Sequence, residues 1–167
     1  FSLCYRFSKN SMSELGNISE RRVFNLLSGK RNLPPFLSDD PGINSGLMIL
    51  QYTSASLVSS NKQLSTPSSI DSITSSNGQE DHVSMGANGA NQLRDIIDNL
   101  FQILAIETIV SAQAKEFNNH KSSKIIKEFI SHIRKLSPKI TDDRVLHNDI
   151  RKVSNYLRKK IKIDLFF

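Results

Sequence analysis

The segment QEDH, residues 79–82, places an amide, two carboxylates and an imidazole side by side. The turn-forming pair Asn-Gly comes directly before it and predicts a tight turn. A carboxylate beside an imidazole can bind or move a proton, with Glu80 as the acid–base group and His82 as the group that orients it. The same residues also suit an ordinary helix start with Asp81 as its N-cap. The residues alone leave both interpretations open.

Other catalytic chemistry finds little support in the sequence. We expect no metal site, because no CxxC, HExxH or paired Cys/His spacing occurs. A glycine-rich phosphate loop and a Ser-centred G-x-S-x-G elbow are both absent. Cys4 is the one cysteine and cannot form an internal disulfide, so we expect a reducing, cytoplasmic location.

The chain of 167 residues carries a net charge of +6, and much of this charge lies in residues 151–162. A basic helix end can bind anions or nucleic acid, but a solvated helix face is the more usual role of such residues. We therefore do not expect nucleic-acid binding, although a helical interaction protein with a basic tail (Arg158, Lys159, Lys160) stays as an alternative. No apolar run is long enough for a bilayer, so no membrane contact is expected. The start at Phe1 predicts a piece of a longer polypeptide.

Apolar residues recur at helical spacing and no strand pattern is found, so the sequence predicts an all-α fold. An interruption is expected near Gly16, and Asp81 or Ser84 is expected to cap the longest helix. Thr141 with Asp142 and Asp143 is expected to restart the last helix, with Val145 on its apolar face. The expected elements are a helix at 11–28, an irregular segment at 29–44, a helix at 45–63, a loop at 64–83, a long helix at 84–118 and terminal helices within 121–160.

The long helix at 84–118 is apolar on nearly every side through its middle, IIDNLFQILAIETIV. A surface helix shows a single apolar stripe, so this helix must be surrounded. The other expected helices look too few and too short for that, which predicts missing parts or partner subunits. The Ser-rich loop at 64–83 is consistent either with a disordered linker or with a shaped functional loop.

Several motifs occur in a fixed order: SELGNISERR (13–22), LPPFL (33–37), GINSGLMILQYTSASLVSSNKQL (42–64), SIDSITSSNGQEDHVSMG (69–86) and LAIETIVSAQAKEF (104–117). Together with DDRVLHNDIRKV (142–153) they resemble the C-terminal third of the histidine ammonia-lyase branch of the aromatic amino-acid lyase family. The resemblance runs from about Met12 to Leu157. The first ten residues fit it poorly, and Asn77-Gly78 replaces the commoner Ala-Asn.

The resemblance implies a long-helix bundle in a homotetramer whose active sites are shared between subunits, and a whole enzyme that converts L-histidine to trans-urocanate and ammonia. It implies that the loop at 64–83 is an active-site loop. Glu80 falls on the family's active-site glutamate, which binds substrate and assists proton transfer, and Gln79 shapes the pocket beside it. The family's electrophile, methylidene-imidazolone, forms from Ala-Ser-Gly, a tripeptide that this chain lacks. We therefore expect the chain to be inactive alone. A tyrosine or phenylalanine lyase or an aminomutase is the alternative.

Overall fold

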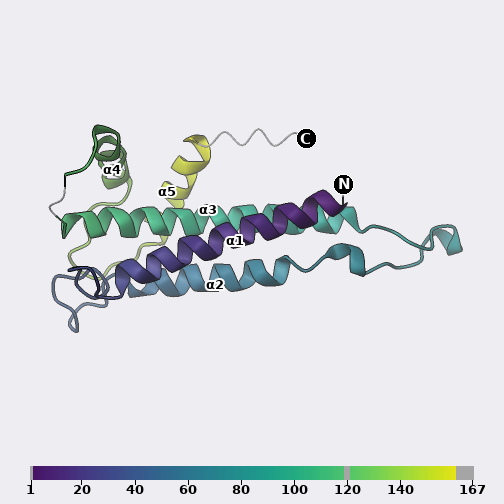
Figure 1. Ribbon diagram of the computed structural model, residues 1–167, viewed down its shortest axis with the longest axis horizontal. Coiled ribbons are helices and arrows are strands. Elements are labelled where there is room, and N and C mark those ends of the chain that lie inside the picture. Colours follow the sequence, from purple (N-terminus) through teal and green to yellow (C-terminus); the bar gives the residue numbers. More distant parts are fainter. Residues whose placement is uncertain (1, 119–120, 161–167) are drawn as a thin grey trace.

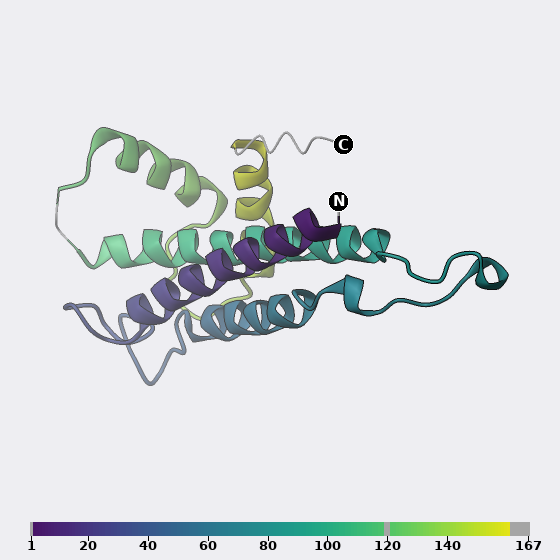
Figure 2. The same ribbon diagram turned by 45° about the vertical axis from the view of Figure 1, so that its right-hand side comes forward.

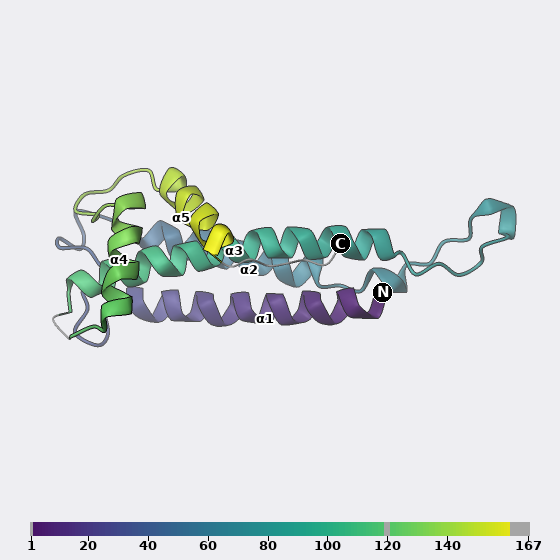
Figure 3. The same cartoon turned by 90° about the horizontal axis from the view of Figure 1, so that it is seen from above.

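The computed structural model describes residues 2–118 and 121–160, and all regular elements in these two ranges are helical (Figure 1). Three long helices run side by side, and two shorter ones pack against the third from its other side (Figures 1 and 3). The helices are α1 (Ser2–Leu27), α2 (Met48–Leu64), α3 (Gly86–Glu116), α4 (Lys124–Leu136) and α5 (His147–Lys160). The predicted all-α class is confirmed.

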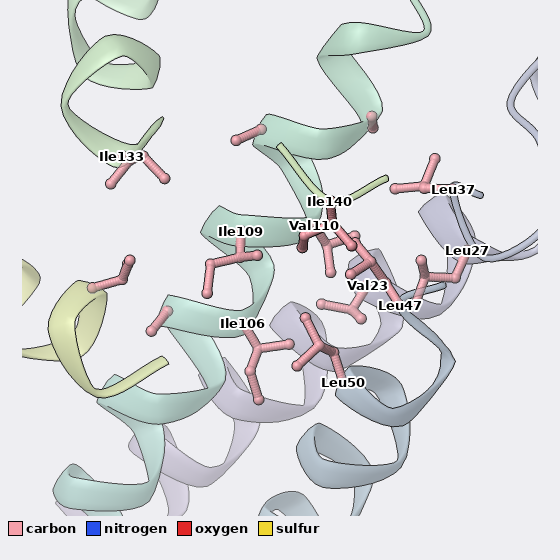
Figure 4. Packing of buried hydrophobic residues seen from close by; sticks show 14 of the residues in the cluster. Val23, Leu27, Leu37, Leu47, Leu50, Ile106, Ile109, Val110, Ile133 and Ile140 are labelled. Atoms are coloured by element: carbon pink, nitrogen blue, oxygen red, sulfur yellow. The ribbon is translucent and has the colours of Figure 1, made fainter. Parts of the chain in front are cut away.

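Helix α3 is the centre of the hydrophobic core. With 31 residues it is about 46 Å long, and its isoleucines at 96, 103, 106 and 109 are fully buried. The chain itself buries all four side chains. Ile106 and Ile109 share one cluster with Val23 of α1, Leu50 of α2 and Ile133 of α4 (Figure 4). The expectation that the chain's own helices could not surround this helix was therefore wrong for its middle.

Helix α1 is continuous from Ser2 to Leu27 and has the most extensive contact with α3. The expected interruption near Gly16 was wrong, because the glycine serves helix packing instead. A Cβ atom built at Gly16 would lie 3.3 Å from Cδ1 of Ile103, so a larger residue would push α1 away from α3. The helix also begins earlier than the periodicity predicts, well before residue 11.

The irregular segment between α1 and α2 packs closely onto the core. Leu33, Leu37 and Leu47 are buried, whereas Phe36 remains partly exposed. Phe36 and Leu37 both adopt left-handed backbone angles, with φ of 54° and 53°. The carbonyl of Phe36 accepts a hydrogen bond of 2.9 Å from the backbone N–H of Leu47. This contact ties the Pro-rich turn to the residue just before α2.

The C-terminal part departs from the prediction at the last helix. Helix α5 begins at His147, so Thr141 does not restart it, and Val145, expected on its apolar face, is 81% exposed. Asp143 accepts hydrogen bonds of 2.8 Å from the backbone N–H groups of Ser45 and Gly46 instead. The acidic side chain that was expected at a helix start thus fixes the turn that precedes α2.

Candidate functional site on the arm between α2 and α3

Residues 65–85 form an arm that extends beyond the ends of the three long helices (Figures 1 and 2). Two single-turn 3₁₀ helices interrupt it, Ser68–Ile70 at its base and Ser76–Gly78 at its tip. All side chains from residue 71 to 82 are exposed. The arm therefore presents its polar residues to the surroundings of the chain and not to its own core.

A tight backbone hairpin forms the tip of the arm. The N–H of Ser75 donates to the carbonyl of Glu80 at 2.8 Å, and the N–H of Glu80 donates back to the carbonyl of Ser75 at 3.3 Å. Ser76 and Asn77 turn the chain with φ of 53° and 54°, a conformation that asparagine adopts more readily than most residues. The hairpin fixes the backbone of Glu80 and of Gln79 beside it.

The side chain of Glu80 is held from within the same hairpin. The Oγ of Ser75 donates a hydrogen bond of 2.7 Å to Oε2 of Glu80. His82, expected to orient this carboxylate, is exposed further along the arm and makes no such contact within the described residues. Ser75 was not among the expected site residues, although the Asn-Gly turn between positions 75 and 80 is a signal that could pair Ser75 with Glu80.

The polar segment also lies further from the long helix than expected. Helix α3 begins at Gly86, after Met85 in a left-handed conformation with φ of 47°. Asp81 therefore lies in the arm and does not cap the helix, and Ser84 is not at the capping position either. The field of a helix end falls off within its first turn, so it gives Glu80 at the tip little support.

The described residues do not build a closed pocket around Glu80. Three hollows among the described residues lie away from Glu80. They are found between the start of α2 and α5, between α3 and α4, and at the base of the arm near Ser68 and Asp71. Among the described residues there is no group of three or more His, Cys, Asp or Glu side chains that could hold a metal ion. A substrate pocket at Glu80 thus requires walls from outside these residues.

Helix α5 uses part of its basic end for packing. Arg158 donates a hydrogen bond of 2.6 Å to Asp98 of α3, and its guanidinium lies 4.5 Å from the ring centre of Phe101. Lys160 lies 6.0 Å from the ring centre of Tyr156 on its own helix. One of the three residues named for anion binding is therefore paired within the chain. None of the described helices has the length and apolar character needed to cross a bilayer.

In both sequence and fold, the chain matches one known protein family. Residues 4–135 match the aromatic amino acid lyase family, and the chain belongs to this family. Histidine ammonia-lyases of Bacillus mycoides (strain KBAB4) and Bacillus anthracis (strain A0248) are each 46% identical to it over 159 residues, which are 94% of this chain and 32% of theirs. The resemblance inferred from the motifs is thereby confirmed.

Solved structures agree with the sequence comparison. Histidine ammonia-lyase from Trypanosoma cruzi superposes with a TM-score of 0.90 at 38% identity, over 95% of this chain and 32% of that one. Tyrosine aminomutase from Streptomyces globisporus also superposes with a TM-score of 0.90, at 31% identity and over 95% and 31% of the two chains. The chain thus spans about a third of the length of the relatives that it matches.

Proposed function

We propose that this chain is the C-terminal helical part of an ammonia-lyase that acts on L-histidine and releases ammonia and trans-urocanate. The observation that carries the proposal is the hairpin of residues 75–80, which holds Glu80 exposed and ready for a site built with other residues. The identity of 46% to histidine ammonia-lyases over nearly the whole chain favours histidine as the substrate.

Glu80 binds the substrate imidazole or amine in this proposal and assists proton transfer. Ser75 donates to Oε2 of the carboxylate, which leaves the second oxygen, Oε1, for contact with a substrate in this proposal. Gln79 precedes Glu80 in the hairpin and shapes the adjoining wall of the pocket. The backbone pairing between Ser75 and Glu80 keeps these groups in place at an exposed tip.

The electrophile of the reaction comes from outside these residues. The tripeptide Ala-Ser-Gly does not occur in the 167 residues, so no residue of this chain forms methylidene-imidazolone. In the proposed whole enzyme that group would supply the electron-accepting centre that makes the amino group a better leaving group. This chain contributes Glu80, Gln79 and the helices that carry them.

Partner subunits complete the site and cover the outer face of α1. Leu3, Phe7 and Ile18 lie along this face at helical spacing and are 65%, 69% and 47% exposed. Apolar residues in such a row favour burial against another chain, and we propose a homotetramer of the whole enzyme in the cytoplasm. The isolated chain lacks the electrophile and is inactive.

Two measurements test this function. The isolated chain, incubated with L-histidine, is expected to form no urocanate, and urocanate formation by it would contradict the proposal. The full-length protein that contains this chain is expected to form urocanate, and Glu80→Gln in it should lower kcat by at least about a hundredfold, since acid–base groups contribute roughly that much. Asp81→Asn, the neighbouring carboxylate, is the matched control and should leave kcat within a fewfold.

An aminomutase is the second candidate, because a tyrosine aminomutase superposes as closely as the histidine ammonia-lyase does. The two functions differ in the product. An aminomutase returns the amino group to the neighbouring carbon, whereas a lyase releases ammonia. Incubation of the full-length protein with L-tyrosine and with L-histidine separates them, and formation of a β-amino acid from tyrosine would support the aminomutase.

A further inference from the structure

A buried lysine joins the two stems of the arm. The side chain of Lys9, on α1, is 1% exposed. Its Nζ donates a hydrogen bond of 2.8 Å to the carbonyl of Thr66, just after α2, and one of 2.5 Å to Oε1 of Gln92, in the first turns of α3. The Oγ of Ser68 donates to the same Oε1 at 2.7 Å. We call these four residues the clasp.

Two further residues on the same face of α1 support the clasp, at positions one helical turn to either side of Lys9. Tyr5 packs on the start of α3, where a Cβ built at Gly89 would lie 3.7 Å from Cβ of Tyr5. The Oγ of Ser13 lies 2.6 Å from Oγ of Ser65, at the end of α2. One face of α1 therefore contacts both the stem that leaves α2 and the stem that enters α3.

The packing of α1 does not by itself require an amine at this position. Burial of a lysine carries a desolvation cost, and here burial lowers the pKa of Lys9. Both acceptors of its Nζ, a backbone carbonyl and a side-chain amide, are neutral. An apolar side chain of similar length would fill the space at lower cost, so the amine is explained by its hydrogen bonds across the two stems.

We propose that Lys9 is a positioning residue, which clasps the two stems of the arm and thereby fixes the direction in which Gln79 and Glu80 are presented. The arm beyond the clasp is exposed and has little other contact with the helices (Figure 2). Its direction therefore depends on where its base is held. The clasp is a property of this chain, and its effect on the reaction rests on the proposed function.

Hydrogen exchange of the 167-residue chain tests the clasp without any assay of activity. The reporters are the backbone amides of Ile70 and Asp71, which donate to the carbonyls of Pro67 and Ser68 at the base of the arm. Lys9→Met keeps the length of the side chain and removes its donors, so both amides should exchange about tenfold faster, the usual weight of one or two hydrogen bonds. The amide of Ile106, in the buried part of α3, should keep its rate.

Three variants separate positioning from general destabilisation. Lys9→Arg retains donors and should restore most of the protection, whereas Arg6→Met, on an exposed position of the same helix, should change nothing. Equal acceleration at Ile106, or unchanged exchange at Ile70 and Asp71, would overturn the proposal. Where Lys9→Met does not fold, Gln92→Leu removes the shared acceptor and must accelerate the same two amides, and its failure to do so overturns the proposal as well.

The effect on the reaction is measured separately in the full-length protein. Lys9→Met should lower kcat with little change in KM, and Lys9→Arg should restore it, because the substrate contacts are kept but presented less accurately. Absence of urocanate formation by the unaltered full-length protein would refute the proposed function and leave the exchange result valid. Normal exchange in Lys9→Met would refute the clasp and leave the proposed function valid.

Discussion

The hydroxyl of Ser75 and the carboxylate of Glu80 are joined by a hydrogen bond of 2.7 Å across the turn at the tip of the arm. The same two residues also pair through their backbones, so that the hairpin and the carboxylate are fixed together. Because both residues lie on an exposed arm, this pairing holds the carboxylate relative to the hairpin, whereas the direction of the whole arm depends on its base.

Ser75→Ala should lower kcat of the full-length protein by about tenfold, since a hydrogen bond to a charged group is worth roughly 1.5 kcal/mol or more. The backbone pairing remains, so the fold should be unaffected. Steady-state kinetics with L-histidine measure the change. Ser76→Ala in the same turn is the control and should retain activity, and an equal loss in both variants would show that the turn and not the Ser75 hydroxyl is responsible.

Gly46→Ala should destabilise the chain by about 3 kcal/mol. The φ of Gly46 is +57°, and an added Cβ would lie 2.7 Å from the carbonyl oxygen of Phe36, a backbone atom that cannot move aside cheaply. Gly42→Ala is the control, because Gly42 also has a positive φ but nothing lies within 4 Å of its added Cβ. Urea unfolding followed by circular dichroism should show a loss of only about 1 kcal/mol for Gly42→Ala.

Ile133→Ala should lower the free energy of unfolding by about 3 kcal/mol, because this side chain is fully buried where α4 packs on the core. Ile125→Ala on the same helix should be close to neutral, since Ile125 is 76% exposed. Chemical unfolding of both variants makes the comparison. Similar losses of unfolding free energy in the two variants would mean that α4 packs on α3 through a different face.

Asp149 should stabilise the fold at neutral pH and lose this contribution in acid. Burial by itself would raise the pKa of this carboxyl, but hydrogen bonds from Arg144 and Ser137 more than offset it, so its pKa lies below the ordinary value. A carboxyl with a lower pKa in the folded state stabilises the fold above its unfolded pKa of about 4 and loses this contribution as the pH falls through the folded pKa.

Asp149→Asn should therefore lower the Tm at neutral pH. It should also reduce the fall in Tm below about pH 5, the range in which carboxyl groups titrate. Thermal scans at several pH values provide the measurement. Asp142→Asn, at an exposed position, is the control and should keep the wild-type slope. A wild-type slope in Asp149→Asn would assign the acid sensitivity to other carboxyl groups.

The helical periodicity predicts terminal helices within 121–160, and α4 (Lys124–Leu136) lies in this range. Its cap at Ser123 was not predicted. The apolar pattern also indicated a buried α3, because few residues in its middle are polar. These features depend on neighbours in sequence. The number of helices that pack around another helix is set by residues far away in the sequence. For this reason, the extent to which the chain's own helices cover α3 was underestimated.

The contacts that hold the turn before α2 and the base of the arm come from residues far apart in the chain. Asp143 reaches Ser45 and Gly46 across nearly a hundred positions, and Lys9 reaches Gln92 across 83. No spacing rule predicts such pairs from a single sequence. The Ser75–Glu80 pair was closer to prediction, but it depends on two left-handed residues in a row, Ser76 and Asn77, and only the asparagine signals that conformation.

The exposure of residues 71–82 has a consequence for how such a protein can change over generations. Substitutions within residues 71–82 remove no core contacts, so their effect on the free energy of unfolding is within about half a kcal/mol in most cases. Variants of Gln79 or of its neighbours can therefore be sampled by mutation without loss of the helical scaffold. Selection can adjust the chemistry of the tip while the stability of the bundle is maintained by an independent set of residues.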